Sequence, residues 1–317
     1  MNFDKYYDSV SAARVLEELA KKKIDVIQRR GDPSTQHLSE VDLDNVVVQE
    51  TGLHRKTWRL SVPGDGTIED HEVLFRVHGV LSKVELVPGN ISKMSASRMA
   101  NLSQRVQIVG LGGGSFDRAI QNTKVIQEHY GRFFGSRRIN PWNVGQAGGA
   151  TYINASCRYF NSEKDDPTAT VIEFGPGVDP LNLFAKANVK GEGLIHTLDN
   201  EVKYFKSAND PASGELFYYS AFPGVFRVGD IVEVQGTVVA FVNRQNIVKT
   251  HFHLVSLTLQ DSKFAKDAEI ARSKVSVPKG PGVTLRRKAC FEEEEDSAVS
   301  HTRRKFKEMR FDDSSEA

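Results

Sequence analysis

The sequence predicts an α+β protein that is mainly β, with two β-rich globular parts and a disordered C-terminal tail. Short runs of β-branched and aromatic residues recur over 45–110 and 151–261, divided by glycine, proline and polar residues. Of the 317 residues, 39% are hydrophobic and 26% charged, which suits globular domains. Beyond residue 275, apolar residues are sparse and charges come in opposite blocks. That segment buries too little apolar surface to offset its ordering entropy.

Residues 1–44 form an N-terminal helical segment, with the helix expected over 8–23. Asp8 or Ser9 caps its first turn, and Leu16 and Ala20 lie among apolar residues at helical spacing. Lysines at 21–23 suit the negative end of the helix dipole. Gly31 then breaks the helix. We interpret this segment as a capped surface helix; the alternative is a basic contact point at its C-terminal end.

Residues 45–150 form the first β-rich domain, and its second half is basic. Strand-like runs such as "HEVLFRVHGVLSKVELVP" are followed over 111–150 by glycine-rich sequence, in which only 118–130 has a helical pattern. Residues 86–150 hold eight Lys or Arg against Asp117 and Glu128, a net charge of +6. The first domain therefore carries the positive charge of a chain whose total is only +1.

The stretch "HYGRFFGSRRINPW" is the first part of a candidate site for single-stranded nucleic acid. Its candidate contact residues are Arg132, Phe133, Phe134, Arg137 and Arg138. Guanidinium groups suit phosphates, and neighbouring rings suit bases. The alternative is a solvated loop whose aromatic residues pack into the core.

Residues 151–265 form the second β-rich domain, which ends in the hairpin "FRVGDIVEVQGTVVAFVNRQNIVKTHFHLVSLTLQD" over 226–261. Alternation places Val234 and Val238 on a core face and Glu233 on the opposite face, where its replacement by lysine should cost little. Gly236 lies mid-strand, as at a bulge or sharp bend. The second strand has apolar residues at both parities. Either both of its faces are covered or a bulge near 254–255 shifts its register.

The pattern GD-x-V-x-V-x-G-T-V, followed by "HLVSLTLQD", resembles the middle strands of OB-fold domains. The resemblance implies a small Greek-key barrel, a fold often used for single-stranded nucleic acid or for protein contacts. The stretches "GLIHTLDNEVKYF", "GDIVEVQGTVVAF" and "LQDSKFAKDAEIARS" also resemble an uncharacterised protein family of mushroom-forming fungi. That second resemblance implies no activity.

Lys203, Tyr204 and Lys206 are the second part of the candidate site, because they precede the aromatic run "ELFYYSAF". Charge counts against it: residues 151–265 hold ten Lys or Arg and thirteen Asp or Glu, a net charge of −3. The alternative is that these aromatic residues pack a β-domain. A nucleic-acid site is favoured if the basic 86–150 residues fall beside the aromatic strands of 204–222.

No pattern predicts an enzyme, a cofactor or a metal. The loop Gly110–Ser115 in "RVQIVGLGGGSFDRAI" could hold phosphate, but it departs from the dinucleotide fingerprint and lacks a Walker lysine. His251 and His253 lack a third ligand. Cys157 is expected to be buried, and its pairing with Cys290 is not expected, which suits a reducing compartment. The sequence shows neither a secretory signal nor an apolar run long enough for a membrane span.

Residues 266–317 are expected to form a short helix and then the disordered tail, which predicts nuclear rather than cytoplasmic localisation. Two basic clusters suit a nuclear import receptor: Arg286, Arg287 and Lys288, then Arg303, Arg304, Lys305 and Lys307. The whole sequence favours a non-enzymatic nuclear binding protein for single-stranded nucleic acid. The first alternative is a protein–protein interaction scaffold without nucleic acid. The second is a nucleotide-binding enzyme that uses Gly110–Ser115.

Overall fold

The computed structural model describes residues 3, 5–52, 56–64, 69–88, 96–140, 142, 144–147, 149–165, 167–175, 177–186, 191, 193–209 and 216–275. Met1–Lys274 form one compact unit. The predicted fold class is confirmed: the protein is mainly β, with 39% strand and 28% helix, and contains a closed five-stranded barrel. The predicted tail lies outside the described residues. None of the described helices is both long and apolar enough to cross a membrane.

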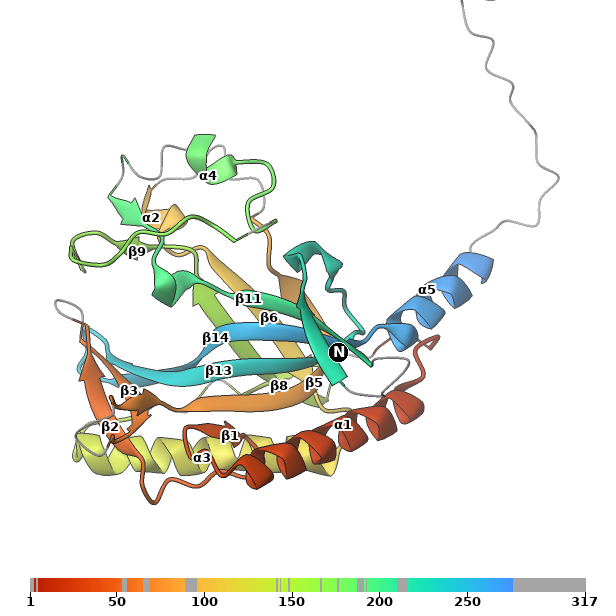
Figure 1. Ribbon diagram of the computed structural model, residues 1–317, viewed down its shortest axis with the longest axis horizontal. Coiled ribbons are helices and arrows are strands. Elements are labelled where there is room, and N and C mark those ends of the chain that lie inside the picture. Colours follow the sequence, from red (N-terminus) through yellow and green to blue (C-terminus); the bar gives the residue numbers. More distant parts are fainter. Residues whose placement is uncertain are drawn as a thin grey trace, which may run out of the picture. The chain divides into compact units, whose positions relative to one another are not determined.

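The barrel is built from β5 (Leu74–Glu85), β6 (Ser103–Val109), β8 (Ala150–Arg158), β13 (Ile231–Val242) and β14 (Val248–Asp261). Its closed order is β5-β6-β8-β14-β13, with β13 returning to β5 (Figure 1). Only the β8–β14 pair is parallel, and the other four pairs are antiparallel. Counted along the chain, the spatial order is 1-2-3-5-4, an OB-like Greek-key arrangement.

The expected division at residue 150 separates strands that share this barrel. β5 and β6 precede that residue, whereas β8, β13 and β14 follow it. The pairs β5–β13 and β6–β8 therefore join the two β-rich halves by backbone hydrogen bonds. Runs of strand-like sequence report local propensity and carry no information about such distant partners. The net charge of 151–265 consequently describes only part of the barrel.

Shorter strands extend the sheet on both sides of the barrel. On one side, β3 (Thr57–Val62) pairs with β13, and β2 (Val47–Thr51) and β4 (His71–Glu72) pair with β3. On the other side, β11 (Lys203–Asn209) pairs with β14, and β12 (Leu216–Ser220) pairs with β11. The remaining strands are β1 (Thr35–His37) on β5, β7 (Val144–Ala147) on β8, and the separate pair β9 (Asn161–Ser162) and β10 (Leu194–Ile195).

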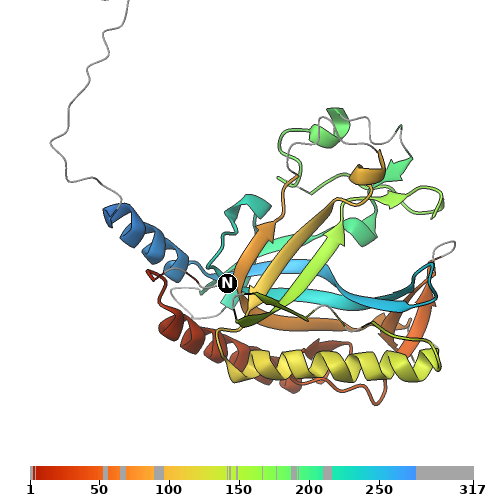
Figure 2. The ribbon, with the colours of Figure 1, turned by 180° about the vertical axis from the view of Figure 1, so that it is seen from behind.

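Two long helices lie side by side against the barrel. These are α1 (Ser9–Arg30) and α3 (Gly114–Phe134), and both views place them on the side away from β11 (Figures 1 and 2). The Asp8 carboxylate accepts a hydrogen bond from the Ser11 backbone N–H at 3.0 Å, which confirms the predicted cap. The short helices are α2 (Ala96–Met99), α4 (Leu183–Lys186), η2 (Leu198–Asn200), η3 (Pro223–Val225) and α5 (Lys263–Val275).

The predicted hairpin of β13 and β14 contains the bulge that the irregular pattern allowed. Gln235 pairs with Ser256, but the next residue, Gly236, pairs with Leu254, so Val255 is the extra residue. The shift brings Leu254 and Leu257 into the same core. A Cβ at Gly236 would lie 2.4 Å from the His253 carbonyl oxygen, so the close approach of these strands requires glycine.

Candidate nucleic-acid interface

The loop between the fourth and fifth barrel strands collects positive charge from two distant parts of the chain. Arg138 and Asn140 flank Val248, the first residue of β14: the Val248 N–H donates to the Arg138 carbonyl at 2.9 Å, and the Asn140 N–H donates to the Val248 carbonyl at 2.8 Å. This pairing places the end of α3 beside the turn 243–247. In OB folds this loop is one of those that flank the oligonucleotide-binding face.

Five exposed cationic side chains surround this junction, and we call them the basic cluster. Its members are Arg132, Arg137, Arg138, Arg244 and Lys249. None of them makes an ion pair with any residue that the structure describes. Exposed cations without an ion-pair partner can neutralise the phosphates of a polyanion, which releases the counterions condensed on that polyanion.

Aromatic rings anchor the basic cluster. The Phe134 ring packs edge-on against Trp58 in the core, with ring centroids 5.0 Å apart. It also contacts the Phe133 ring at 5.1 Å, and the Arg137 guanidinium lies 5.9 Å from its centroid. Phe133 itself is 52% exposed. Phe134 is thus a packing residue, whereas Phe133 leaves about half of its surface in solvent, where a base could stack on it.

The second part of the predicted site lies elsewhere. Lys203, Tyr204 and Lys206 belong to β11, on the side of the barrel away from α3 in both views (Figures 1 and 2). Tyr204 is only 6% exposed, and its hydroxyl donates a hydrogen bond to the Gln104 side chain. The structure therefore does not bring the end of α3 beside β11, and Tyr204 is a core residue. The seven predicted import residues lie outside the described part of the chain.

Sequence reasoning missed Arg244 and Lys249. Arg244 lies in the turn after β13 and Lys249 is the second residue of β14, and these two charges alone are too few to indicate a site. Their connection to Arg137 and Arg138 arises only because Ile139 forms a bridge with Val248. No local pattern could have indicated that bridge, since more than a hundred residues separate its two partners.

The outer face of the second and third barrel strands is polar. Arg105 pairs with Ser156 and Gln107 with Asn154 in the β6–β8 register, and the Gln107 amide donates to the Asn154 side chain at 3.3 Å. Arg105 lies 3.9 Å from the Glu85 carboxylate, and both side chains are about half exposed. This face offers hydrogen-bonding groups, whereas the basic cluster offers unpaired charge.

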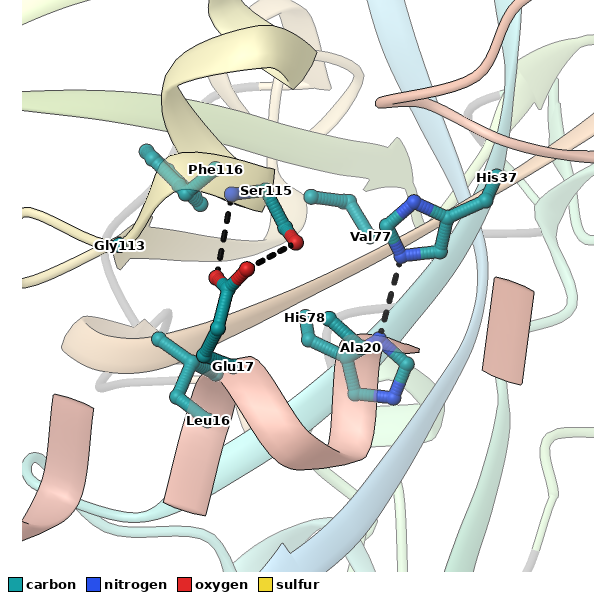
Figure 3. Close-up of a pocket in the computed structure, with 9 residues that line it drawn as sticks. All are labelled: Leu16, Glu17, Ala20, His37, Val77, His78, Gly113, Ser115 and Phe116. Carbon is teal, nitrogen blue, oxygen red and sulfur yellow. Dashed lines mark hydrogen bonds between the residues drawn. The ribbon is translucent and has the colours of Figure 1, made fainter. Parts of the chain in front are cut away.

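The glycine loop at the start of α3 is occupied by a carboxylate of the protein itself. Glu17, from α1, accepts hydrogen bonds from the Ser115 backbone N–H at 3.1 Å and from the Ser115 hydroxyl at 2.8 Å (Figure 3). It thereby satisfies the positive end of the α3 dipole, as a phosphate would. The predicted nucleotide site at Gly110–Ser115 is thus filled by a cap that fixes α3 against α1.

Between α1 and the barrel lies a buried charge network centred on Glu233. Its carboxylate contacts Lys23 Nζ at 3.0 Å, Arg76 at 2.7 Å and His78 Nε2 at 3.3 Å. Burial alone would raise the pKa of Glu233, but the His78 hydrogen bond and the charges of His78, Lys23 and Arg76 lower it overall. The expectation that Glu233 faces solvent is wrong: alternation placed it outside the barrel, but α1 covers that face and leaves it 2% exposed.

Two histidines continue this network toward Ser39. His78 Nδ1 lies 3.3 Å from His37 Nε2, and His37 Nδ1 lies 2.7 Å from the Ser39 hydroxyl (Figure 3 shows the histidine pair). The Ser39 backbone N–H also donates to His37 Nδ1 at 3.2 Å, so this ring nitrogen is an acceptor. Burial, followed by the charge of His78, lowers the pKa of His37 to about 3, so this ring is neutral.

The other candidate chemical groups are structural in the described part of the chain. Cys157 is 1% exposed, and burial raises the pKa of its thiol to about 12, which keeps the thiol protonated at neutral pH. The described residues contain no group of three or more His, Cys, Asp or Glu side chains arranged to hold a metal ion. The His253 ring instead contacts the Asp199 carbonyl at 3.0 Å.

Comparison with known proteins adds little to this geometry. No family model matches the chain, and no curated protein matches it. Among solved structures, a similar one is gp2.5, a single-stranded DNA-binding protein encoded by bacteriophage T7. The two chains are 9% identical with a TM-score of 0.32, over 59% of this chain and 86% of gp2.5. A similarity this distant carries no functional argument.

Proposed function

We propose that this protein is a non-enzymatic binding protein for single-stranded nucleic acid. The observation that carries the proposal is the basic cluster, whose five exposed cations lie on the two segments that meet at Val248 and make no ion pair among the described residues. The exposed Phe133 lies on one of these segments, at the end of α3. Cations contact phosphates without regard to sequence, and an exposed ring can stack on any base. Together they favour an extended strand with accessible bases over a closed duplex.

The test is fluorescence anisotropy with a labelled oligothymidylate, an oligoadenylate and a duplex of the same length, each at low and moderate salt. Arg137→Ala and Arg138→Ala should each weaken binding to every single strand and lower the magnitude of the salt slope by about 0.7. Phe133→Ala should cost about 1–3 kcal/mol and leave the slope nearly unchanged, since stacking releases no counterions. Lys266→Ala, an exposed lysine on α5, is the matched control and should bind as the wild type does.

Two results would reject the proposal. One is wild-type protein without measurable affinity for any single strand at low salt, which would favour the protein–protein scaffold. The other is an equal loss for Lys266→Ala and Arg137→Ala, which would mean that binding follows total charge rather than the basic cluster. Because Phe133 is exposed whereas Phe134 packs on Trp58, Phe133→Ala should retain the wild-type thermal transition.

We also propose that the protein is nuclear, on the basis of its sequence alone. Two basic clusters, residues 286–288 and 303–307, flank the acidic run 292–296. Such clusters are read by nuclear import receptors when they are accessible. A fluorescent reporter fused to residues 280–317 should accumulate in the nucleus, and replacing both clusters with alanine should abolish that accumulation. A cytoplasmic reporter would contradict this proposal without affecting the one on nucleic acid.

A further inference from the structure

Strand β12 is an open edge of the sheet. Among the described residues it pairs with β11 alone. All five of its residues, Leu216–Ser220, are exposed, and its side chains Leu216, Phe217, Tyr218 and Tyr219 are each between 43 and 49% accessible. Within the part of the chain that the structure describes, the strand therefore presents a row of backbone groups without a strand partner, and it has apolar side chains on both of its faces.

β12, the run LFYYS, lacks two of the features that commonly protect an edge strand, a charged residue and a proline. The opposite end of the same sheet, β2, carries Glu50, which is paired with Lys56 at 2.8 Å. An uncharged aromatic edge is a template for another strand, whereas β2 carries a protecting charge.

We propose that β12 pairs with β12 of a second copy of this chain, antiparallel, around a two-fold axis through Tyr218. A strand of five residues centred on Tyr218 pairs that residue with itself, Phe217 with Tyr219 of the second copy, and Leu216 with Ser220 of the second copy. Such an isologous pairing uses one surface twice and closes on itself. It joins two sheets into one continuous sheet.

The side chains suit this register. Within one copy Tyr219 lies opposite Lys206, and Phe217 lies opposite Ala208. Across the axis, the row on this face reads Lys206, Tyr219, then Phe217 and Ala208 of the second copy. Aromatic rings thus meet as direct cross-strand pairs, and no like charges face each other.

The other face of β12 is compatible with the same axis. Tyr218 lies there, and its hydroxyl accepts a hydrogen bond from Lys23 Nζ at 3.0 Å. The same Lys23 contacts Glu233 at 3.0 Å, so each copy neutralises the lysine that it brings toward the axis.

The area available is close to what a specific dimer needs. An aromatic side chain buries about 150–250 Å² when it is fully covered, so three half-exposed rings and Leu216 offer about 350–450 Å² per copy. The exposed Phe222, two residues after the strand, adds about 100 Å². The pair thus buries about 1,000 Å², the lower limit for a biological interface, which predicts a dimer of moderate affinity.

The first experiment measures the mass of the full-length protein by light scattering after gel filtration over a range of concentrations. The wild type should approach twice the chain mass of 35.3 kDa as concentration rises. Tyr218→Lys places two lysines on the axis and should raise the dimer dissociation constant at least tenfold. Phe133→Lys makes the same kind of change on an exposed ring of the basic cluster and should leave the dimer intact. A monomeric wild type, or a dimer unaffected by Tyr218→Lys, overturns the proposal.

A second experiment tests the register independently of affinity. In a Cys290→Ser background, Tyr218→Cys should form a disulfide-linked dimer under mild oxidation, because directly paired residues bring their Cβ atoms to about 4.5–5.5 Å. Phe217→Cys alone should not, but it should cross-link to a Tyr219→Cys chain when the two are mixed. Self-linkage at 217 without linkage at 218 would overturn this axis. Circular dichroism of each variant ensures that only folded protein is compared.

Discussion

At the scale of the residue, Glu233 shows how a buried charge is stabilised. Three cationic or hydrogen-bonding side chains from two elements surround its carboxylate. Together they offset a desolvation cost that is several kcal/mol per ion. The network connects α1 and the barrel, because Lys23 belongs to the helix whereas Arg76, His78 and Glu233 belong to the strands. Alternation in the sequence predicted which way Glu233 points but gave no sign of the helix that covers it.

We expect Glu233→Gln to lower the free energy of unfolding by about 3 kcal/mol, since it leaves Lys23 and Arg76 buried near an uncharged amide. Glu233→Lys should prevent folding, because it adds a third like charge. Urea unfolding followed by tryptophan fluorescence measures the difference. Glu85→Gln is the control: Glu85 pairs with Lys83 but is half exposed, so its loss should cost less than about 1 kcal/mol. Equal costs for Glu85→Gln and Glu233→Gln would contradict the buried network.

The same network predicts a loss of stability in acid. The pKa of Glu233 is lowered in the folded protein, so its contribution is present above the unfolded value and is lost as the pH falls toward the folded one. The pKa of His37 is lowered to about 3 in the folded protein. Below about pH 6.5, the His37 side chain is therefore protonated in the unfolded chain but stays neutral in the folded one. Each such proton costs about 1.4 kcal/mol per pH unit.

The urea midpoint should therefore fall between pH 7 and pH 4, and His37→Gln should make that fall smaller above pH 5. The remainder belongs to His129, His196 and His253, whose pKa values burial also lowers. Glutamine keeps a hydrogen-bonding group but does not titrate. A pH dependence unchanged in His37→Gln would show that other groups cause it.

At the scale of the element, the β13–β14 hairpin was predictable because its signals are local. Alternation located the core residues of β13, a mid-strand glycine indicated the bend, and apolar residues at both parities allowed the bulge at Val255. The end of α3 was only half predictable. Its arginines and rings were visible in sequence, but the separation of Phe133 from Phe134 into a free ring and a packed ring depends on Trp58, which comes from a distant strand.

Gly236 provides the test at this scale. We expect Gly236→Ala to lower the free energy of unfolding by about 1–3 kcal/mol, since the added methyl would collide with the His253 carbonyl and the Phe252 ring. Gly224→Ala is the matched control, because no atom lies within 4 Å of the Cβ that it would add. Thermal unfolding of both variants gives the comparison. A Gly236→Ala protein as stable as Gly224→Ala would place the two strands farther apart than they are here.

At the scale of the whole molecule, the fold depends on pairings between distant strands, which local sequence patterns could not predict. The barrel closes only because β13 returns to β5, across position 150, and because β14 lies parallel to β8, from which about a hundred residues separate it. Local composition does not indicate which distant strands will pair, so these long loop closures could not be predicted from it. The same closure creates the basic cluster and separates it from β11, so the site as well as the fold depends on long-range pairing.

Separate production of the two halves tests this dependence. Residues 45–150 contain β5 and β6, and residues 151–265 contain β8, β13 and β14, so each half alone exposes barrel edges and apolar surface that its partner strands cover. We expect each fragment to lack the dispersed amide resonances of a folded protein, whereas residues 1–275 should show them, because Met1–Lys274 form one compact unit. Coexpression of 1–149 with 150–275 should restore dispersion, since the break falls between β7 and β8 and cuts no barrel strand. A fragment 151–265 that folds alone would instead show that the second β-rich part is an independent domain, with its own core and without need of β5.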